Sequence, residues 1–460
     1  MRNHSFKLVA TMVAVLAPAA HAQTYVVGPN VNVTKLTGNQ SEQSIAINRV
    51  NTDLITVGSN GRGGGGIFVG YSSNGGATWT PSSFGPTSCC DPWMGADRFG
   101  NMYVSYLTSS ITTTIARSTN GGASYTIIGN IAGSSDHPEM GIGPGPTPGT
   151  DSIYLRDTTG GNNRIISATA TGLGATSAFA TQSGVATGTG NFGSIAVGPA
   201  GRAAFTSMNP SGGIGPTNMT IRYDADGTGP GAFATQSTVV TQVGGFRPVT
   251  PQPSRTVDAQ VDLEYDSSGG VNNGALYMLY TQAANTTTNN TDIVFRRSND
   301  NGATFSSELK LNNDVGTKSQ FFGRLAIDQT TGWLGAVWYD ARNSVANNTV
   351  EVWGTLSFNG GVSWEPNFKI SQGVTSCLAA TIGNDGNECG DYIALDFHDG
   401  KLVAAWGDTS NSTGDNPNGT TRIDTYFAKV TVTAAVPEPG TYALLALGLL
   451  AVGARARRRS

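Results

Sequence analysis

Charged residues are scarce in this sequence. Lys, Arg, Asp and Glu make up 13% of the 460 residues, and the formal net charge is −4 without a stripe of basic residues. A nucleic-acid-binding surface needs clustered Lys and Arg, so the composition argues against nucleic acid as a partner. The low charge, the 62 glycines and the abundant Asn, Thr and Ser argue against a helical protein and favour an all-β exported protein with many tight turns.

Cysteine and histidine are also rare, with four residues of each kind. No Cys/His spacing resembles a zinc site. No EF-hand-like loop is present, and the nearest segment, residues 384–388, is interpreted as a turn. The many Asp and Asn residues of an exported protein are compatible with a bound calcium ion, and no other cofactor is indicated.

The four cysteines are Cys89, Cys90, Cys377 and Cys389. Four cysteines allow three pairings, and the sequence alone does not choose among them. In an exported protein we expect oxidised cysteines. Our preferred pairing is a Cys377–Cys389 bridge around a Gly-rich loop, with Cys89 and Cys90 either joined to each other or left as thiols.

The distinct hydrophobic runs lie at the two ends of the chain. At the N-terminus, a basic start (residues 2–7) precedes an apolar stretch (residues 8–16) and a small-x-small cleavage site that ends at Ala22. We therefore expect residues 1–22 to be a secretory signal peptide, so that the mature chain begins at Gln23. The apolar stretch is too short to favour a membrane anchor.

At the C-terminus, Pro437, Glu438 and Pro439 precede the apolar stretch 441–453, and four arginines follow within residues 455–459. This order resembles the PEP-CTERM sorting signal of Gram-negative bacteria. The arginines satisfy the positive-inside rule, which keeps them cytoplasmic while the rest of the chain crosses the membrane. The apolar stretch is near the lower length limit of a spanning helix.

That resemblance implies a location and a partner. An exosortase would recognise residues 436–460 and cleave near the Pro-Glu-Pro triplet, and the short apolar helix would hold the chain only transiently in the inner membrane. The final location would be the cell surface or the extracellular polysaccharide matrix. An ordinary single-pass anchor is the alternative.

One eight-residue pattern, Ser-x-Asp/Asn-x-Gly-x-Ser/Thr-aromatic, occurs four times, at residues 72–79, 118–125, 298–305 and 357–364. An Asp or Asn side chain accepts hydrogen bonds from the backbone of a tight turn, and Gly supplies the positive φ that the turn needs. The four Asp or Asn residues are Asn74, Asn120, Asp300 and Asn359. The pattern resembles the Asp-box, or BNR repeat, of sialidase-like β-propellers, and it indicates a fold and not a catalytic site.

The four copies belong to a longer unit of about 55 residues, which occurs seven times. Each unit begins with a short apolar strand, at residues 44–48, 93–97, 139–143, 194–198, 262–266, 324–328 and 392–396. A turn and a second strand follow, and a third strand leads into the Asp-box where there is one. The third and fourth units lack a recognisable box, although residues 223–227 resemble a decayed copy.

These units predict an all-β propeller of four-stranded blades over residues 23–435. We expect seven blades. Sialidases have six, so six blades with a decorated segment is the alternative. The seventh unit ends near Val432 after three strands, and we expect residues 30–36 to supply its fourth strand and close the ring.

Chain direction places many polar residues at one end of the propeller, the top face, where the first strand of each unit begins. One group stands ahead of the first strands: Glu42, Asp91, Asp136, His137, Asp258, Gln320 and Asp391. A second group follows the second strands: Asn60, Arg62, Arg156, Asp157, Asp340, Arg342 and Asp408. Carboxylates accept hydrogen bonds from sugar hydroxyls, and Arg pairs with acidic sugars, so this rim suits a glycan site.

The rim supplies the candidate site residues. The ligand-binding candidates are Glu42, Arg62, Asp136, His137, Arg156, Asp258, Arg342 and Asp391. The catalytic candidates are Asp91, Asp340 and Asp408. The sequence leaves a structural alternative open for each residue, in which the Asp side chains cap turns and join adjacent blades.

The sialidase resemblance implies three arginines around the substrate carboxylate, a Tyr–Glu nucleophile pair and an Asp acid/base. The first arginine of that family lies in a Phe/Tyr-Arg-Ile-Pro motif in the first blade. Here the first blade has residues 42–45 without such an Arg, and the nearest string, residues 246–248, lacks the Ile and lies in a Pro-rich loop. We therefore expect an exported propeller that binds glycan or protein without catalysis. A sialidase-like glycoside hydrolase or lyase that uses the rim carboxylates is the alternative, and a purely structural role is the third.

Overall fold

The computed structural model describes residues 23–61, 66–84, 88–134, 136–182, 190–191, 193–208, 214–224, 233, 235–379 and 388–434. The chain separates into a body, Val27–Thr431, and a small unit formed by its two ends, Met1–Val26 and Val432–Ser460. In the small unit, the hydroxyl oxygens of Thr24 and Thr433 lie 2.7 Å apart.

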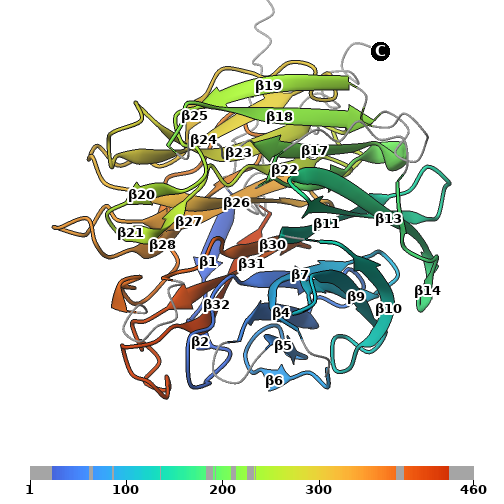
Figure 1. Cartoon of the computed structure of the whole chain (residues 1–460), viewed down its shortest axis with the longest axis horizontal. Coiled ribbons are helices and arrows are strands. Elements are labelled where there is room, and N and C mark those ends of the chain that lie inside the picture. Colours follow the sequence, from blue (N-terminus) through green and yellow to red (C-terminus); the bar gives the residue numbers. More distant parts are fainter. Residues whose placement is uncertain are drawn as a thin grey trace, which may run out of the picture. The chain divides into compact units, whose positions relative to one another are not determined.

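The body is a β-propeller of seven antiparallel blades, counted over the described residues, in which the strands of a blade follow one another from the axis outward (Figure 1). The first blade consists of β3 (Ser44–Ile47), β4 (Ile55–Asn60), β5 (Ile67–Ser72) and β6 (Thr80–Pro81), and the second of β7 (Cys90–Ala96), β8 (Met102–Leu107), β9 (Thr112–Ser118) and β10 (Thr126–Ala132). The third blade consists of β11 (Asp136–Pro144), β12 (Asp151–Thr159), β13 (Asn162–Gly172), β14 (Ala175–Thr176) and β15 (Ala180–Thr181). The fourth blade consists of β16 (Ile195–Val197), β17 (Ala203–Met208), β18 (Thr217–Asp224) and β19 (Thr235–Thr241). The fifth blade consists of β22 (Asp262–Tyr265), β23 (Leu276–Ala283), β24 (Thr291–Ser298) and β25 (Leu309–Lys310). The sixth blade consists of β26 (Gln320–Asp328), β27 (Trp333–Asp340), β28 (Glu351–Ser357) and β29 (Phe368–Lys369). The seventh blade consists of β30 (Ala394–His398), β31 (Lys401–Asp408) and β32 (Asp424–Thr433), with which β1 (Thr24–Val27) and β2 (Val31–Asn32) pair.

Seven blades are confirmed, and each of the seven predicted first strands overlaps the innermost strand of a blade. The innermost strands of all seven blades line a central channel of about 160 Å³. The described residues contain no α-helix, and the one complete 3-10 turn among them is η1 (Pro199–Gly201). None of the described residues forms a helix long and apolar enough to cross a membrane. Residues 225–227 of the decayed Asp-box lie outside the described residues.

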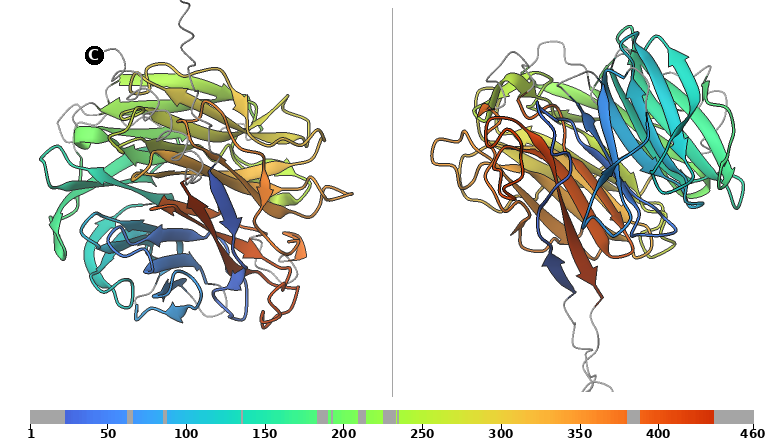
Figure 2. Two further views of the ribbon diagram at one scale, coloured as in Figure 1. Left: turned by 180° about the vertical axis from the view of Figure 1, so that it is seen from behind. Right: turned by 90° about the horizontal axis from the view of Figure 1, so that it is seen from below.

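An N-terminal strand closes the ring, as predicted. Strand β2 pairs with β32, with Val31 opposite Phe427, so strands from the two ends of the body lie side by side (Figure 2). Adjacent blades then share their apolar cores. One such core joins Trp93 and Tyr103 of the second blade to Met140 and Leu155 of the third. Because each blade buries its faces against its neighbours, the body needs no single large core.

The Asp-box residues form the expected turns. In the first copy, the Ser72 hydroxyl donates to Asn74 Oδ1 (2.9 Å) and accepts from the Gly76 N–H (2.9 Å). Asn74 Oδ1 also accepts from the Thr78 N–H (2.9 Å). The same hydrogen bonds recur in the other three copies, around Asn120, Asp300 and Asn359.

Each box also contacts the preceding blade of the ring. The contacts with the preceding blade are Lys429 Nζ to the Gly75 carbonyl, the Ser82 hydroxyl to the Gly122 carbonyl, the Ser237 hydroxyl to the Gly302 carbonyl, and the Phe295 ring beside Gly361. The boxes therefore join neighbouring blades at the end opposite the top face.

A substitution at Gly361 tests whether the fourth Asp-box joins its blade to the preceding one. Its φ is +77°, and a Cβ built there would lie 2.4 Å from the Phe295 ring. We expect Gly361→Ala to lower the free energy of unfolding by about 3–4 kcal/mol, from the positive φ and the clash together. The matched control is Gly269, with φ +75° and nothing within 4 Å of its built Cβ. Gly269→Ala should cost only about 1 kcal/mol. Equal losses in denaturant unfolding would show that the box does not join the blades.

Two disulfides are present. Cys377 is bonded to Cys389, which was the preferred pairing, and Cys89 is bonded to its neighbour Cys90. A two-stranded hairpin, β20 (Arg247–Val249) and β21 (Gln252–Val257), is inserted between the fourth and fifth blades. The prediction of a Pro-rich loop at residues 246–248 is wrong in part, because Arg247–Val249 pairs with β21 as strand β20.

Candidate functional site

Polar residues from five blades meet at the top face. They are linked by hydrogen bonds, ion contacts and electrostatic interactions, and we call them the axial cluster: Glu42, Asp91, Asp136, His137, Asp258 and Asp391. All six stand ahead of the first strand of a unit, the placement that chain direction predicted. Asp91 lies in β7, Asp136 and His137 lie in β11, and the other three lie in loops. The two residues farthest apart in the sequence are Glu42 and Asp391, more than 300 positions from each other.

A repeated backbone feature brings these side chains together. In six blades, the residue two positions before the predicted first strand has a positive φ, and in the fourth blade that position, residue 192, lies outside the described residues. The six residues are Glu42, Asp91, His137, Gln260, Phe322 and Gly390. At three of these places the pairing with the second strand also shifts register, as in a β-bulge. A bulge changes the direction of the side chains around it, and non-glycine residues accept this conformation at a cost of roughly 1–3 kcal/mol each.

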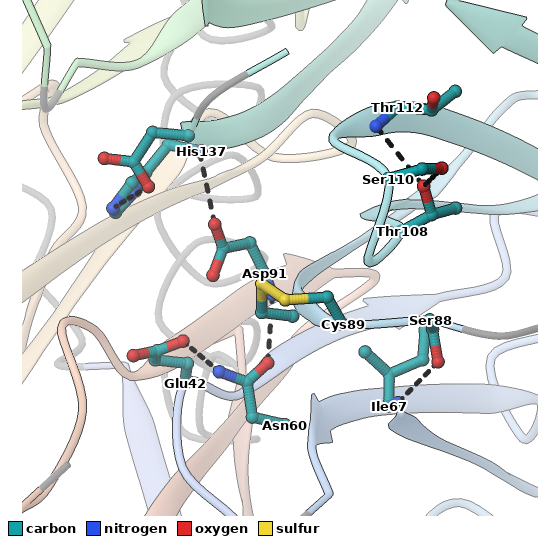
Figure 3. The surroundings of a disulfide bond; sticks show 12 residues. Glu42, Asn60, Ile67, Ser88, Cys89, Asp91, Thr108, Ser110, Thr112 and His137 are labelled. Carbon is teal, nitrogen blue, oxygen red and sulfur yellow. Dashed lines mark hydrogen bonds and ion pairs between the residues drawn. A yellow bond between two sulfur atoms is a disulfide. The ribbon is translucent and has the colours of Figure 1, made fainter. Parts of the chain in front are cut away.

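Hydrogen bonds connect one side of the cluster (Figure 3). The Asn60 side-chain amide donates to Glu42 Oε2, and its oxygen accepts from the Asp91 N–H (2.9 Å). Asp91 Oδ2 in turn accepts from the His137 N–H (3.3 Å). The Cys89–Cys90 disulfide immediately precedes Asp91 in the chain. This chain of contacts fixes the positions of three blades' rim residues relative to one another.

An arginine from the inserted hairpin covers the other side of the cluster. Arg255 Nε donates to Asp391 Oδ1 (2.8 Å), and its Nη2 contacts both Asp391 Oδ2 and Glu42 Oε1, the latter at 3.2 Å. Buried Glu388, beside the Cys377–Cys389 disulfide, accepts from the N–H groups of Ser254 and Arg255, each at 3.1 Å. The sequence analysis missed Arg255, because no strand period or motif marks it and its partner Asp391 lies 136 residues away.

Burial and crowding of charge perturb the cluster. Burial raises the pKa of Asp91 to about 6 and, with Asp391 nearby, that of Asp258 to about 7. Burial, with Asp391 and Asp91 close by, also raises the pKa of Glu42 well above its ordinary value. For His137, burial lowers the pKa, but Asp136 and Asp91 outweigh burial and raise it to about 10. At neutral pH Asp258 is therefore about half protonated, the protonated form of Glu42 is favoured, and His137 is a cation.

A pocket of about 260 Å³ opens beside the cluster, and we call it the top-face pocket. Its lining residues are Asp136, Phe246, Arg255, Thr256, Val257, Asp258, Phe322 and Asp391. Three carboxyl groups against one guanidinium give the lining a formal charge of −2 when all are ionised. Phe246 is 57% exposed and supplies an aromatic surface at this pocket.

The remaining predicted site residues make other contacts. Asp340 and Asp408 are buried, and each accepts from the indole N–H two residues earlier, that of Trp338 (2.8 Å) and that of Trp406 (2.9 Å). Gln320 donates to Asp340 (3.1 Å). These aspartates line neither the central channel nor the top-face pocket, and the tryptophan bonds give them a structural role in their own blades.

The predicted arginines are also engaged locally. Arg156 is fully buried and donates to Asn163 Oδ1 (2.7 Å), whereas Arg342 pairs with Asp340 (2.7 Å) and lies over the Trp353 ring. Arg62 lies outside the described residues. Asp157 forms an ion pair with Arg164 (2.5 Å). Within the described residues, Arg255 is therefore the one arginine that lines the top-face pocket.

Among the described residues, no group of three or more His, Cys, Asp or Glu side chains is arranged to hold a metal ion. Residues 384–387, part of the segment closest to an EF-hand loop, lie outside them. The described site is an acidic pocket with aromatic residues in its lining.

The C-terminal segment matches a known family over residues 435–459, described as the PEP-CTERM protein-sorting motif. The chain carries this sorting signal. The motif implies export, processing by an exosortase and sorting to the cell surface. No curated protein matches the chain as a whole.

Solved structures with a similar fold are sialidase- and arabinanase-type β-propellers. A protein of unknown function from Dyadobacter fermentans has 11% identity and a TM-score of 0.47, over 89% of this chain and 99% of its own. An α-L-arabinofuranosidase from Fusarium graminearum has 13% identity and a TM-score of 0.44, over 72% of this chain and 98% of its own. The NanB sialidase of Streptococcus pneumoniae has 11% identity and a TM-score of 0.41, over 88% and 70%. These values support no transfer of activity or of site residues.

Proposed function

We propose that this sorted protein binds a glycan of the cell surface or extracellular matrix in its top-face pocket and does not cleave it. The observation that carries the proposal is the meeting, at one pocket, of carboxylates from several blades with Arg255 and the exposed ring of Phe246. Carboxylates accept hydrogen bonds from sugar hydroxyls, and an aromatic face packs against the apolar face of a sugar ring. The terminal signal supports delivery to a glycan-rich location. We further propose that the apolar stretch 441–453 holds the chain in the inner membrane only until exosortase cleavage.

The hydrogen bonds of the pocket favour binding over catalysis. Both carboxylate oxygens of Asp391 are held by Arg255, and Asp136 Oδ2 accepts from the Asn191 amide (2.6 Å). A glycosidase needs one carboxylate that is free to attack or to activate water, together with a carboxylic acid. Two of the three pocket carboxyls are thus already committed to partners in the protein.

The charge of the pocket disfavours a sialidase. Sialic acid is an anion, and its carboxylate would approach a lining with three carboxyl groups and one arginine. That arginine is already paired with Asp391 and Glu42. An anionic sugar would have to break these ion pairs, so a sialoside is a poor ligand for this pocket.

One observation favours a second candidate, a glycoside hydrolase. Burial raises the pKa of Asp258 to about 7, so that its carboxyl is partly protonated at neutral pH. A protonated carboxyl in a pocket is suited to act as a general acid on a glycosidic oxygen. In this alternative Asp258 would be the acid and Asp136 or Asp391 the second carboxylate.

A glycan panel with product detection by mass tests the proposal. We expect the full-length chain to retain one or more glycans without releasing product. Phe246→Ala should weaken binding roughly tenfold, because the aromatic contact is lost. Leu173→Ala is the matched control, since Leu173 is 58% exposed and lines no described pocket. Turnover that is lost in Asp258→Asn would replace the binding proposal with the hydrolase, and retention unchanged by Phe246→Ala would place the site elsewhere.

A further inference from the structure

Negative charge exceeds positive charge around the top-face pocket. Even when Glu42 and Asp258, whose pKa values are raised, are left out, the three carboxylates of Asp91, Asp136 and Asp391 outnumber the two cations beside them, His137 and Arg255. His137 Nε2 lies 3.5 Å from Asp136 Oδ1, and its positive charge also opposes the rise in the pKa of the pocket residue Asp258. The field of the folded chain therefore favours a cation at this place and repels an anion.

One pocket oxygen is available to a ligand. Asp258 is only 6% exposed, yet it lines the pocket. Its Oδ1 accepts from the Gln260 N–H, whereas Oδ2 has no hydrogen-bond partner among the residues that the structure describes. Asp258 Oδ2 is not among the fully buried oxygen atoms without a partner, so it is open to the pocket, where a ligand donor would take the place of water.

The chemistry of that donor follows from the surroundings. A metal ion needs several close oxygen ligands, and the described residues offer no such group. An ammonium group needs fewer protein ligands than a metal ion. It has three N–H donors, of which one carboxylate accepts part, and hydroxyl groups or water accept the rest. The aromatic ring of Phe246 at the same pocket would add a cation–π contact or a stacking surface.

We propose that the top-face pocket recognises a glycan with free amino groups, in which an ammonium group pairs with Asp258 Oδ2 and the sugar ring packs on Phe246. This inference rests on the proposed function and names its ligand class. The proposed ligand carries positive charge, whereas the sialic acid of sialidase substrates is an anion. The neutral hydroxyls of the ligand would be held by the carboxylates and by Arg255 at the rim of the same pocket.

Oligosaccharides that differ in one group test the ligand class. Titration calorimetry of the full-length chain would compare glucosamine oligomers with N-acetylglucosamine, glucose and glucuronic acid oligomers of equal length. We expect the free-amine oligomers to bind at least tenfold more tightly than the other three. Their affinity should fall as salt increases, because the added contact is between charges.

Variants separate the pocket from general attraction to an acidic surface. Asp258→Asn should remove most of the preference for the free amine, while the raised pKa of Asp258 indicates that a neutral side chain fits there. Asp53→Asn removes an exposed carboxylate near the Asp-box end, 63% exposed, and should leave the preference unchanged. A thermal melt equal to that of the wild type would show that Asp258→Asn is folded.

Each outcome decides between the two proposals. Equal affinity for free-amine and N-acetylated oligomers, or tighter binding of the uronic acid oligomer, would overturn the ammonium inference and leave glycan binding in place. An amine preference that survives Asp258→Asn would overturn it as well. If none of the four oligomers bound to the folded chain, both the inference and the proposed glycan-binding function would fail on this panel.

Discussion

Replacing buried Glu388 with Ala is expected to lower the free energy of unfolding by about 2 kcal/mol, because two partly buried N–H donors lose their charged acceptor. The same change should abolish ligand binding at the top-face pocket. The Glu388 carboxylate accepts from the N–H groups of Ser254 and Arg255 and so holds the inserted hairpin over the axial cluster. Without it, Arg255 is no longer held at Asp391 and Glu42, and the pocket loses one wall.

Two further variants define this effect. Glu388→Gln keeps one acceptor oxygen and should recover part of both the stability and the binding. Glu365→Ala removes an exposed glutamate and should change neither. Denaturant unfolding and glycan retention are the two measurements. If Glu388→Ala unfolds at the wild-type midpoint and binds as the wild type does, the hairpin is not held by this carboxylate.

The second large effect is a loss of stability as pH rises. Burial raises the pKa of Glu139 and Asp258 to about 7 and that of Asp91 to about 6. A carboxyl with a raised pKa holds its proton more tightly in the folded chain, so stability is retained below about pH 4 and is lost as pH rises from there to about 7. His137, raised to about 10, adds a loss of the same sign between about pH 6.5 and 10.

We therefore expect the chain to melt at a higher temperature at about pH 5 than at about pH 8, with a difference in free energy on the order of 3 kcal/mol. The measurement is Tm by calorimetry at one scan rate across that range. Glu139→Gln should flatten the profile, because Glu139 is buried and its Oε2 has no hydrogen-bond partner among the described residues. Glu365→Gln, at an exposed position, should leave the pH profile of Tm unchanged. A Tm that rises with pH over this range would contradict the proposed charge state of the cluster.

The fold could be predicted because its signals are local. The Asp-box turn is built from residues within eight positions of each other, and the short strands recur at a constant spacing, so seven blade starts could be located from the sequence. Chain direction alone then placed Glu42, Asp91, Asp258 and Asp391 at one end of the propeller. Closure of the ring by an N-terminal strand could be predicted because the seventh unit has three strands where a blade needs four.

The rest of the site depends on contacts that no local pattern marks. Asp340 and Asp408 occupy the same end of their strands as other rim residues, but each bonds to a tryptophan two residues earlier in its own strand. Arg255 reaches Asp391 only because an inserted hairpin folds over the axis. The positive φ at Glu42 and His137 is likewise invisible in the sequence, since the usual sign, glycine, is absent there.

The central claim is that ligand binds in the top-face pocket, and carboxyl labelling of the full-length chain tests it most directly. The chain would be treated with a water-soluble diazo compound, which esterifies carboxyl groups without an added amine, with and without a glucosamine oligomer that it retains, and the labelled residues read by mass spectrometry. We predict that the ligand lowers labelling of Asp136, Asp258 and Asp391 several-fold and leaves Asp53 unchanged. Equal labelling of the three pocket carboxyls in the presence of saturating ligand would show that the glycan binds somewhere else on the propeller.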